Sequence, residues 1–132
     1  MPKQTLMLSP LKKAITALQI AINQPKNEFT RDATIQRFEY TFELAWKMLK
    51  RHLTKEAGLE EYSLKNLFRE AGRLGLIENT DNWFSYLEAR NLTSHTYNEE
   101  TAEETYRVAK NFAPDALKLL NQLEKFYGNT AS

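Results

Sequence analysis

The chain has 132 residues, of which 42% are hydrophobic and 27% charged, the proportions of one ordinary globular domain. Its 18 Lys and Arg residues nearly balance its 17 Asp and Glu residues, so no global positive field indicates nucleic acid as a partner. A local basic patch, or a groove between two subunits, would still suffice for an RNA substrate. The absence of cysteine excludes disulfides and thiolate metal sites.

No part of the sequence predicts a membrane or secretory protein. No apolar run approaches the roughly 18 residues needed to span a bilayer. Residues 1–15 lack the long apolar core and the cleavage site of a signal peptide. The expected location is therefore cytoplasmic, with no membrane partner.

The first two predicted helices follow from apolar residues that recur at helical spacing. One begins with Ser9 as its N-cap and Pro10 at its first position, and ends near residue 24. The second begins at Thr30 or Asp32 and carries an apolar stripe over about six turns. Its cationic end, KMLKRH at residues 47–52, is expected to be a solvated face. The stripe consists of Ile35, Phe38, Phe42, Ala45, Trp46, Leu49 and Leu53.

Two shorter helices are predicted next. Ser63 caps the third, after which Gly72 and Gly75 offer left-handed stops. The fourth starts at Thr80 or Asp81. The residues expected to face the core are Leu64, Leu67, Phe68 and Ala71 on the third helix, and Trp83, Leu87 and Leu92 on the fourth.

The last predicted helix is capped by Asn98, with Glu99 and Glu100 beside its positive end. Pro114 is expected to kink or interrupt it, which makes the total five or six helices. Residues 128–132 should form a disordered tail. The sequence thus predicts an all-α protein, an up-and-down antiparallel helical bundle in which residues 1–132 form a single domain.

The stretch EARNLTSHTYNEE, residues 88–100, gathers an arginine, a histidine and a tyrosine where the fourth helix stops. Residues five apart on an α-helix differ by about 140° in direction, so Arg90 and His95 cannot act side by side within one helix. They can converge if the helix ends near Ser94 and His95 lies in the following turn. A second subunit could also bring another copy of the pair across an interface.

The residue types at this helix end suit RNA cleavage. A neutral imidazole can accept the proton of a ribose 2′-hydroxyl, and a guanidinium can hold a phosphate bidentately. Because His95 would lie near Arg90 and a positive helix end, we expect its ring to be largely neutral at pH 7. Asn91 could hold the phosphate or orient a catalytic group. The structural alternative is that Arg90 pairs with Glu88 or with an acid among residues 99–104, while His95 caps helix carbonyls.

Other residues give weaker signals. His52 and His95 show no carboxylates at metal-ligand spacing, so neither a metal site nor a cofactor is predicted. Trp83 and Tyr86 lie near the motif and are candidates for contact with a ligand or partner in a cleft, with core packing as the alternative.

The sequence RNLTSHTY, residues 90–97, has the form R-x4-H-x-Y and resembles the signature of the HEPN domain superfamily. More narrowly, the chain is similar to the branch of nucleotidyltransferase substrate-binding proteins encoded beside a minimal nucleotidyltransferase (MNT). RDATIQRFEYTFELAWKMLK at residues 31–50 and FREAGRLGLIENTDNW at residues 68–83 continue the resemblance. It covers about residues 10–127.

The resemblance implies a HEPN-type bundle, usually a homodimer whose two motifs face each other across the interface. Active members are metal-independent endoribonucleases, and their catalytic pair corresponds to Arg90 and His95, supported by Asn91. In toxin–antitoxin pairs the MNT silences the toxin by adding AMP to the motif tyrosine, here Tyr97, which would block phosphate entry. The alternatives are a non-catalytic subunit that binds nucleotide or substrate for the MNT, and a dimerising scaffold.

Overall fold

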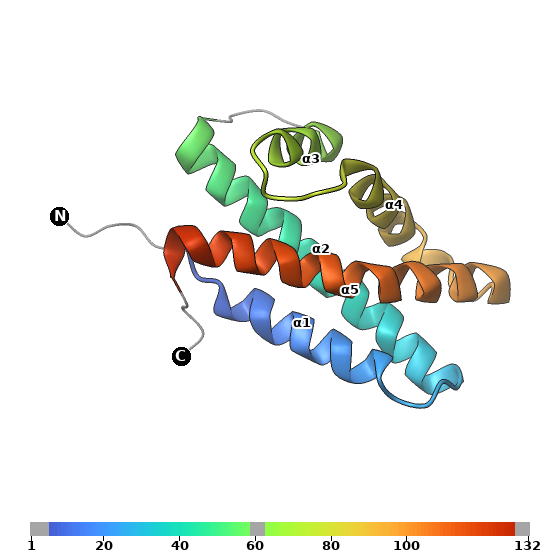
Figure 1. Cartoon of the computed structure of the whole chain (residues 1–132). Coiled ribbons are helices and arrows are strands. Elements are labelled where there is room, and N and C mark those ends of the chain that lie inside the picture. The colour runs from blue at the N-terminus through green and yellow to red at the C-terminus, as the bar shows by residue number, and fades with distance from the viewer. Residues whose placement is uncertain (1–5, 59–62, 129–132) are drawn as a thin grey trace.

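The computed structural model describes residues 6–58 and 63–128. Within these ranges the chain forms five α-helices and one short 3-10 turn, with no strand, which confirms the predicted all-α bundle. The two long helices cross at the centre; α1 packs against both on one side, and α3 and α4 lie on the other (Figure 1). The helices are α1 (Ser9–Ile22), α2 (Glu28–Ala57), α3 (Leu64–Arg73), α4 (Thr80–Asn91) and α5 (Glu99–Tyr127).

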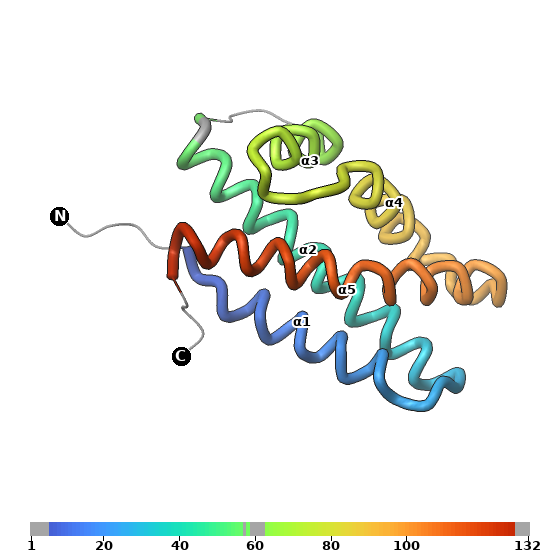
Figure 2. The backbone as a smooth tube through the Cα atoms, in the orientation of Figure 1, coloured from blue at the N-terminus to red at the C-terminus, as the bar shows by residue number. Residues whose placement is uncertain are grey.

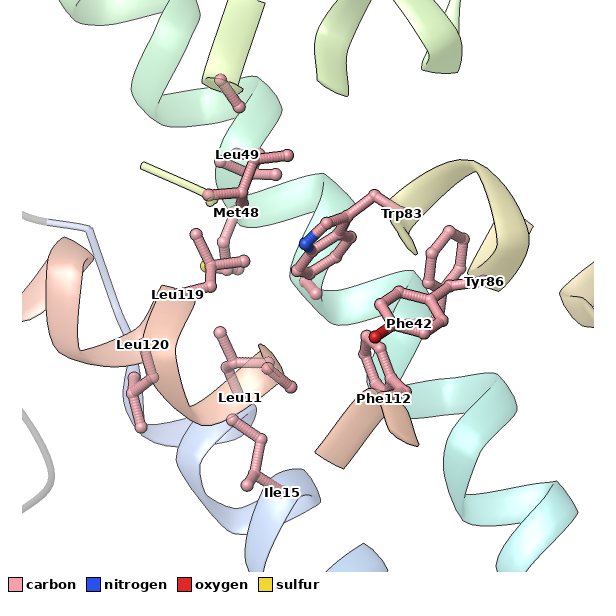
Figure 3. Close-up of a cluster of buried hydrophobic side chains, with 14 of the residues drawn as sticks. Leu11, Ile15, Phe42, Met48, Leu49, Trp83, Tyr86, Phe112, Leu119 and Leu120 are labelled. Carbon is pink, nitrogen blue, oxygen red and sulfur yellow. The ribbon is translucent and has the colours of Figure 1, made fainter. Parts of the chain in front are cut away.

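Aromatic rings from four helices fill the centre of the bundle (Figure 3). The Trp83 ring centroid lies 5.5 Å from that of Phe68 and 5.6 Å from that of Phe112, and Phe42 contacts all three rings. These tilted and edge-on contacts are the favourable arrangements for aromatic pairs. The predicted stripe of α2 is confirmed, since all its members are buried except Trp46, which is partly buried.

Two helix starts differ from the prediction. Ser9 is the first residue of α1 rather than its cap; Leu8 precedes the helix and supplies no side-chain hydrogen bond. α2 begins before Thr30 and Asp32, because Asn27 forms a capping box. The Thr30 N–H donates to Asn27 Oδ1, and the Asn27 N–H donates to the Thr30 hydroxyl, each over 2.9 Å.

Most of the other predicted helix caps and glycine turns are confirmed. Ser63 and Asn98 each accept the expected backbone N–H at a helix start, and Gly75 adopts a left-handed φ of 78°. Gly72 is not a left-handed stop, since it lies inside α3. A Cβ at Gly72 would collide with the Thr80 hydroxyl, so this glycine allows the start of α4 to approach α3 closely.

Pro114 neither interrupts nor ends α5, which runs as one continuous helix of 29 residues (Figure 2). Pro114 itself is exposed, while Ala113 and Ala116 on either side of it are buried. Packing on both sides of the proline therefore keeps the helix together despite the missing hydrogen bond. Gly128 caps α5, and the predicted disorder of the remaining tail falls on residues 129–132, outside the described residues.

Candidate active site

The R-x4-H-x-Y motif lies at the junction between α4 and α5. α4 ends at Asn91, and a single 3-10 turn, η1 (Thr93–His95), follows it. The Thr93 hydroxyl donates to the Arg90 carbonyl over 2.8 Å, and the His95 N–H donates to the Leu92 carbonyl over 2.9 Å. His95 therefore lies outside α4, in the turn that leads to α5. Leu92, expected in the core, is 39% exposed, because the chain leaves the helix at this residue.

The Arg90 side chain, on α4, contacts two residues of α2. Its Nε lies 3.0 Å from Oε1 of Glu43, and its guanidinium carbon lies 6.0 Å from the centre of the Phe42 ring. Nε is buried, and its contact with Glu43 is an ion pair without hydrogen-bond geometry. Neither Nη atom donates to any described residue. The structural alternative, in which Arg90 pairs with Glu88 or with an acid among residues 99–104, is therefore not observed, since the acidic partner comes from α2.

The other motif side chains face solvent. His95 and Asn91 are exposed, and Tyr97 is 88% exposed. The His95 and Tyr97 ring centroids are 6.2 Å apart in an edge-on arrangement. Within the described residues the His95 ring makes no hydrogen bond, so the capping role considered as an alternative is not observed. This turn thus presents an imidazole and a phenol side by side.

Trp83 and Tyr86, the candidates for a cleft, belong to the core. They are 1% and 3% exposed, and Figure 3 shows them beside Phe42 and Phe112. The Tyr86 hydroxyl donates to the Asp115 carboxylate, and burial together with this acid raises the pKa of Tyr86 above its ordinary value. Both rings turn inward because α4 presents them to α5, so the expectation of ligand or partner contact is corrected.

An ion-pair cluster next to the motif fastens the start of α5 to the start of α2. Arg31 is only 5% exposed; its guanidinium donates to Glu99 and Glu103 on α5 and to Asp32 on its own helix. Lys26 also donates to Glu103, and the hydrogen bonds from Lys26 and Arg31 lower the pKa of that carboxyl. Glu99 and Glu103 at the start of α5 are therefore paired with cations of the same chain, a pairing that the sequence did not predict.

Glu43 is the functional candidate that the sequence did not reveal. It lies next to a stripe residue, Phe42, on a helix whose polar residues otherwise resemble an ordinary solvated surface. Only the packing of α2 against α4 brings its carboxylate to Arg90. No spacing rule within a single helix could have identified this pair.

No group of three or more His, Asp or Glu side chains in the described ranges is arranged to hold a metal ion. No helix in the same ranges is long and apolar enough to cross a membrane.

A five-helix bundle with this motif between its last two helices is a HEPN-type protein. The family described as nucleotidyltransferase substrate binding protein like matches residues 6–125, and the chain belongs to this family. A curated relative, the Probable ribonuclease HepT of Haemophilus influenzae, is 40% identical over 95 residues, which are 69% of this chain. The match spans 65% of that relative's own length.

Two solved structures share the fold. A protein from Thermus thermophilus superposes with a TM-score of 0.79 at 35% identity, covering 86% of this chain and 98% of the other. A Haemophilus influenzae protein, whose structure is described as revealing the fold of a substrate binding domain of a nucleotidyltransferase, superposes with a TM-score of 0.82 at 33% identity. This second alignment covers 89% of this chain and 98% of the other.

Proposed function

We propose that the protein is the HEPN component of a two-protein module with an MNT, and that it is a metal-independent endoribonuclease. One observation carries the proposal: the same helix junction holds Arg90, whose Nη atoms are unpaired, and His95, whose ring makes no hydrogen bond to a described residue. The name of the Haemophilus relative, a probable ribonuclease, supports the same activity.

The proposed reaction is an internal transfer to phosphorus. The His95 imidazole accepts the proton of a ribose 2′-hydroxyl, and the 2′-oxygen attacks the adjacent phosphorus. The bond from phosphorus to the 5′-oxygen breaks, and that oxygen leaves with a proton from the imidazolium. Arg90 stabilises the charge that develops on the phosphate oxygens, and Asn91 supports the phosphate. The products are a 2′,3′-cyclic phosphate and a 5′-hydroxyl.

Tyr97 is the proposed site of control. In the active module a homodimer places its two motifs opposite each other, and the MNT transfers AMP from ATP to the Tyr97 phenol oxygen, with pyrophosphate as the leaving group. The high exposure of Tyr97 supports access by a partner enzyme. Its ring centroid lies 6.2 Å from that of His95, so an added AMP would obstruct the approach of substrate by bulk and negative charge.

RNA cleavage in the presence of EDTA tests the proposal. The wild-type protein should convert single-stranded RNA into fragments with 2′,3′-cyclic phosphate ends, and Arg90→Ala should lose this activity. Arg107→Ala, which removes an exposed arginine of α5 paired with Glu104, is the matched control and should cleave normally. If the wild-type protein leaves RNA intact at high concentration, with and without EDTA, the ribonuclease proposal fails.

A second candidate is a non-catalytic subunit that presents nucleotide or substrate to the MNT. The description of the matching family and that of the Haemophilus structure both favour it. Growth after induction separates the two candidates. Toxicity that His95→Ala abolishes supports the ribonuclease; absence of toxicity, together with tight co-purification with an MNT encoded nearby or measurable nucleotide binding, supports the binding subunit.

A further inference from the structure

The ion pair between Glu43 and Arg90 joins the middle of α2 to the last turn of α4. The Glu43 Oε1 lies 3.0 Å from Arg90 Nε, and the two side chains are 30% and 28% exposed. Nε is buried, whereas neither Nη atom forms a hydrogen bond or ion pair with a described residue. The carboxylate therefore occupies the inner edge of the guanidinium and leaves its outer edge unused.

The guanidinium nitrogens of Arg90 that remain free decide how this side chain can bind a phosphate. A guanidinium can grip a phosphate through its two Nη atoms or through Nε and one Nη. The second geometry is disfavoured because Nε is buried, with the Glu43 carboxylate 3.0 Å away from it. Phe42 further restricts the group, because its ring lies 6.0 Å from the guanidinium carbon. Both constraints come from neighbouring residues of one long helix.

We propose that Glu43 is a positioning residue, which holds Arg90 so that its two Nη atoms face the scissile phosphate. This inference rests on the proposed ribonuclease function and adds a residue to it. Catalysis through a charged group requires that group to be oriented before the transition state forms. An arginine at the last turn of a helix, followed directly by a turn, has few covalent constraints on its long side chain. The contact with α2 supplies the constraint.

If Glu43 only stabilised the fold, its removal would lower stability rather than the cleavage rate of the folded enzyme. Ion pairs with this much solvent exposure contribute little to folding, because water screens them and two long side chains lose freedom. If the Glu43 carboxylate instead competed with the substrate phosphate for Arg90, it would inhibit the enzyme, and its removal would raise the cleavage rate. Glu43 forms its ion pair through Nε and no hydrogen bond with an Nη atom, which favours positioning over competition.

Steady-state cleavage by Glu43→Ala and Glu43→Gln, with Glu39→Ala as control, tests the role. Glu39 is an exposed residue one turn earlier on α2, and its substitution removes the same charge. We expect Glu43→Ala to lower kcat about 10–100-fold, as misplacement of a catalytic group does. KM should stay the same or fall, because a negative charge near the phosphate is lost. Glu43→Gln keeps an oxygen acceptor and should recover part of kcat, while Glu39→Ala should keep the wild-type kcat.

Three results would overturn the inference. The first is a kcat for Glu43→Ala equal to that of Glu39→Ala. The second is a higher kcat than the wild type, which indicates competition. The third is a fall in melting temperature of more than about 10 °C for Glu43→Ala without recovery in Glu43→Gln, which indicates a structural role.

A spectroscopic measurement keeps the inference separate from the proposed function. The Arg90 Nε–H, whose resonance is assigned by its loss in Arg90→Lys, is buried and should exchange slowly with water in the wild-type protein. In Glu43→Ala, where the guanidinium is no longer held against α2, the same proton should exchange fast. An unchanged exchange rate in Glu43→Ala refutes positioning, whether or not RNA is cleaved. Absence of cleavage by the wild-type protein, with the expected change in exchange, refutes the ribonuclease function and leaves Glu43 as the residue that orients Arg90.

Discussion

The two histidines of the chain lie near opposite ends of α5, and they differ in exposure, in hydrogen bonding and in neighbours. His95 lies exposed in the turn before the helix starts. His52, on α2, is 2% exposed; its Nδ1 is hydrogen-bonded to the Tyr127 hydroxyl over 2.6 Å, and its ring centroid lies 4.5 Å from that of Phe126. α5 separates the two sites by about 40 Å along its axis. The His95 ring is accessible to solvent, whereas the His52 ring joins two helices.

Burial gives the two rings different chemistry. Desolvation lowers the pKa of His52 below the ordinary histidine value; Lys55 adds to this effect and Glu56 opposes it. His52 thus holds the ends of α2 and α5 together as a neutral side chain. The residue type is the same at both sites, so the burial and the neighbours of each ring decide what it can do.

The largest expected difference between the two ends concerns RNA cleavage. His95→Ala should lower the cleavage rate by about 10²–10⁴-fold, the usual contribution of a general base. Its melting temperature should equal that of the wild-type protein, because the ring makes no hydrogen bond to a described residue. Gel assays of a labelled RNA, with His52→Asn as the control that should still cleave, measure the difference. Equal loss of activity in both variants would contradict it.

Stability should respond in the opposite order. His52→Ala should lower the free energy of unfolding by about 2–3 kcal/mol, because it leaves a cavity beside Phe126 and removes the partner of the Tyr127 hydroxyl. His95→Ala should change it by less than about 0.5 kcal/mol. Urea denaturation followed by circular dichroism gives both values. A larger loss in His95→Ala than in His52→Ala would reverse the assignment of the two roles.

A smaller effect should appear in the dependence of stability on pH. Since burial lowers the pKa of His52, the unfolded chain binds a proton at this residue more readily than the folded protein does. The free energy of unfolding should therefore fall as the pH drops below about 6.5, the unfolded histidine value, toward the folded pKa. Urea midpoints from pH 7.5 to 5 should fall more in the wild-type protein than in His52→Asn. Equal slopes would show that His52 is not the titrating group.

The smallest expected effects on folding concern the tyrosine next to each histidine. Tyr97→Phe should change the free energy of unfolding by less than about 0.5 kcal/mol, because its ring is 88% exposed. Tyr127→Phe should lower it by about 1 kcal/mol through loss of the hydrogen bond to His52. With radiolabelled ATP and the MNT, Tyr97→Phe should accept no AMP while Tyr127→Phe is modified normally. Labelling of Tyr97→Phe would place the modification elsewhere.

Local patterns predicted the helices well and their exact starts less well. The apolar stripe of α2 is a repeat along one helix, and the caps Ser63 and Asn98 each accept from the residue three positions further on, so both can be read from the sequence. The sequence predicted Thr30 as a cap of α2, because threonine is also favoured at N-caps. The structure has Asn27 as the N-cap and uses both residues in one capping box. The cations of the run at residues 47–52 are exposed, as predicted for a solvated face, while His52 at its end is buried, which the sequence did not predict.

The sequence by itself determined an all-α bundle and placed the R-x4-H-x-Y motif at a helix end, because helical periodicity and capping act within a few residues. Only the tertiary structure decided that Trp83 and Tyr86 turn inward, that His52 is buried, and that Glu43 reaches Arg90. Each of these outcomes depends on where two helices cross and at what rotation. That crossing results from packing of the whole core, so no pattern within a single helix encodes it.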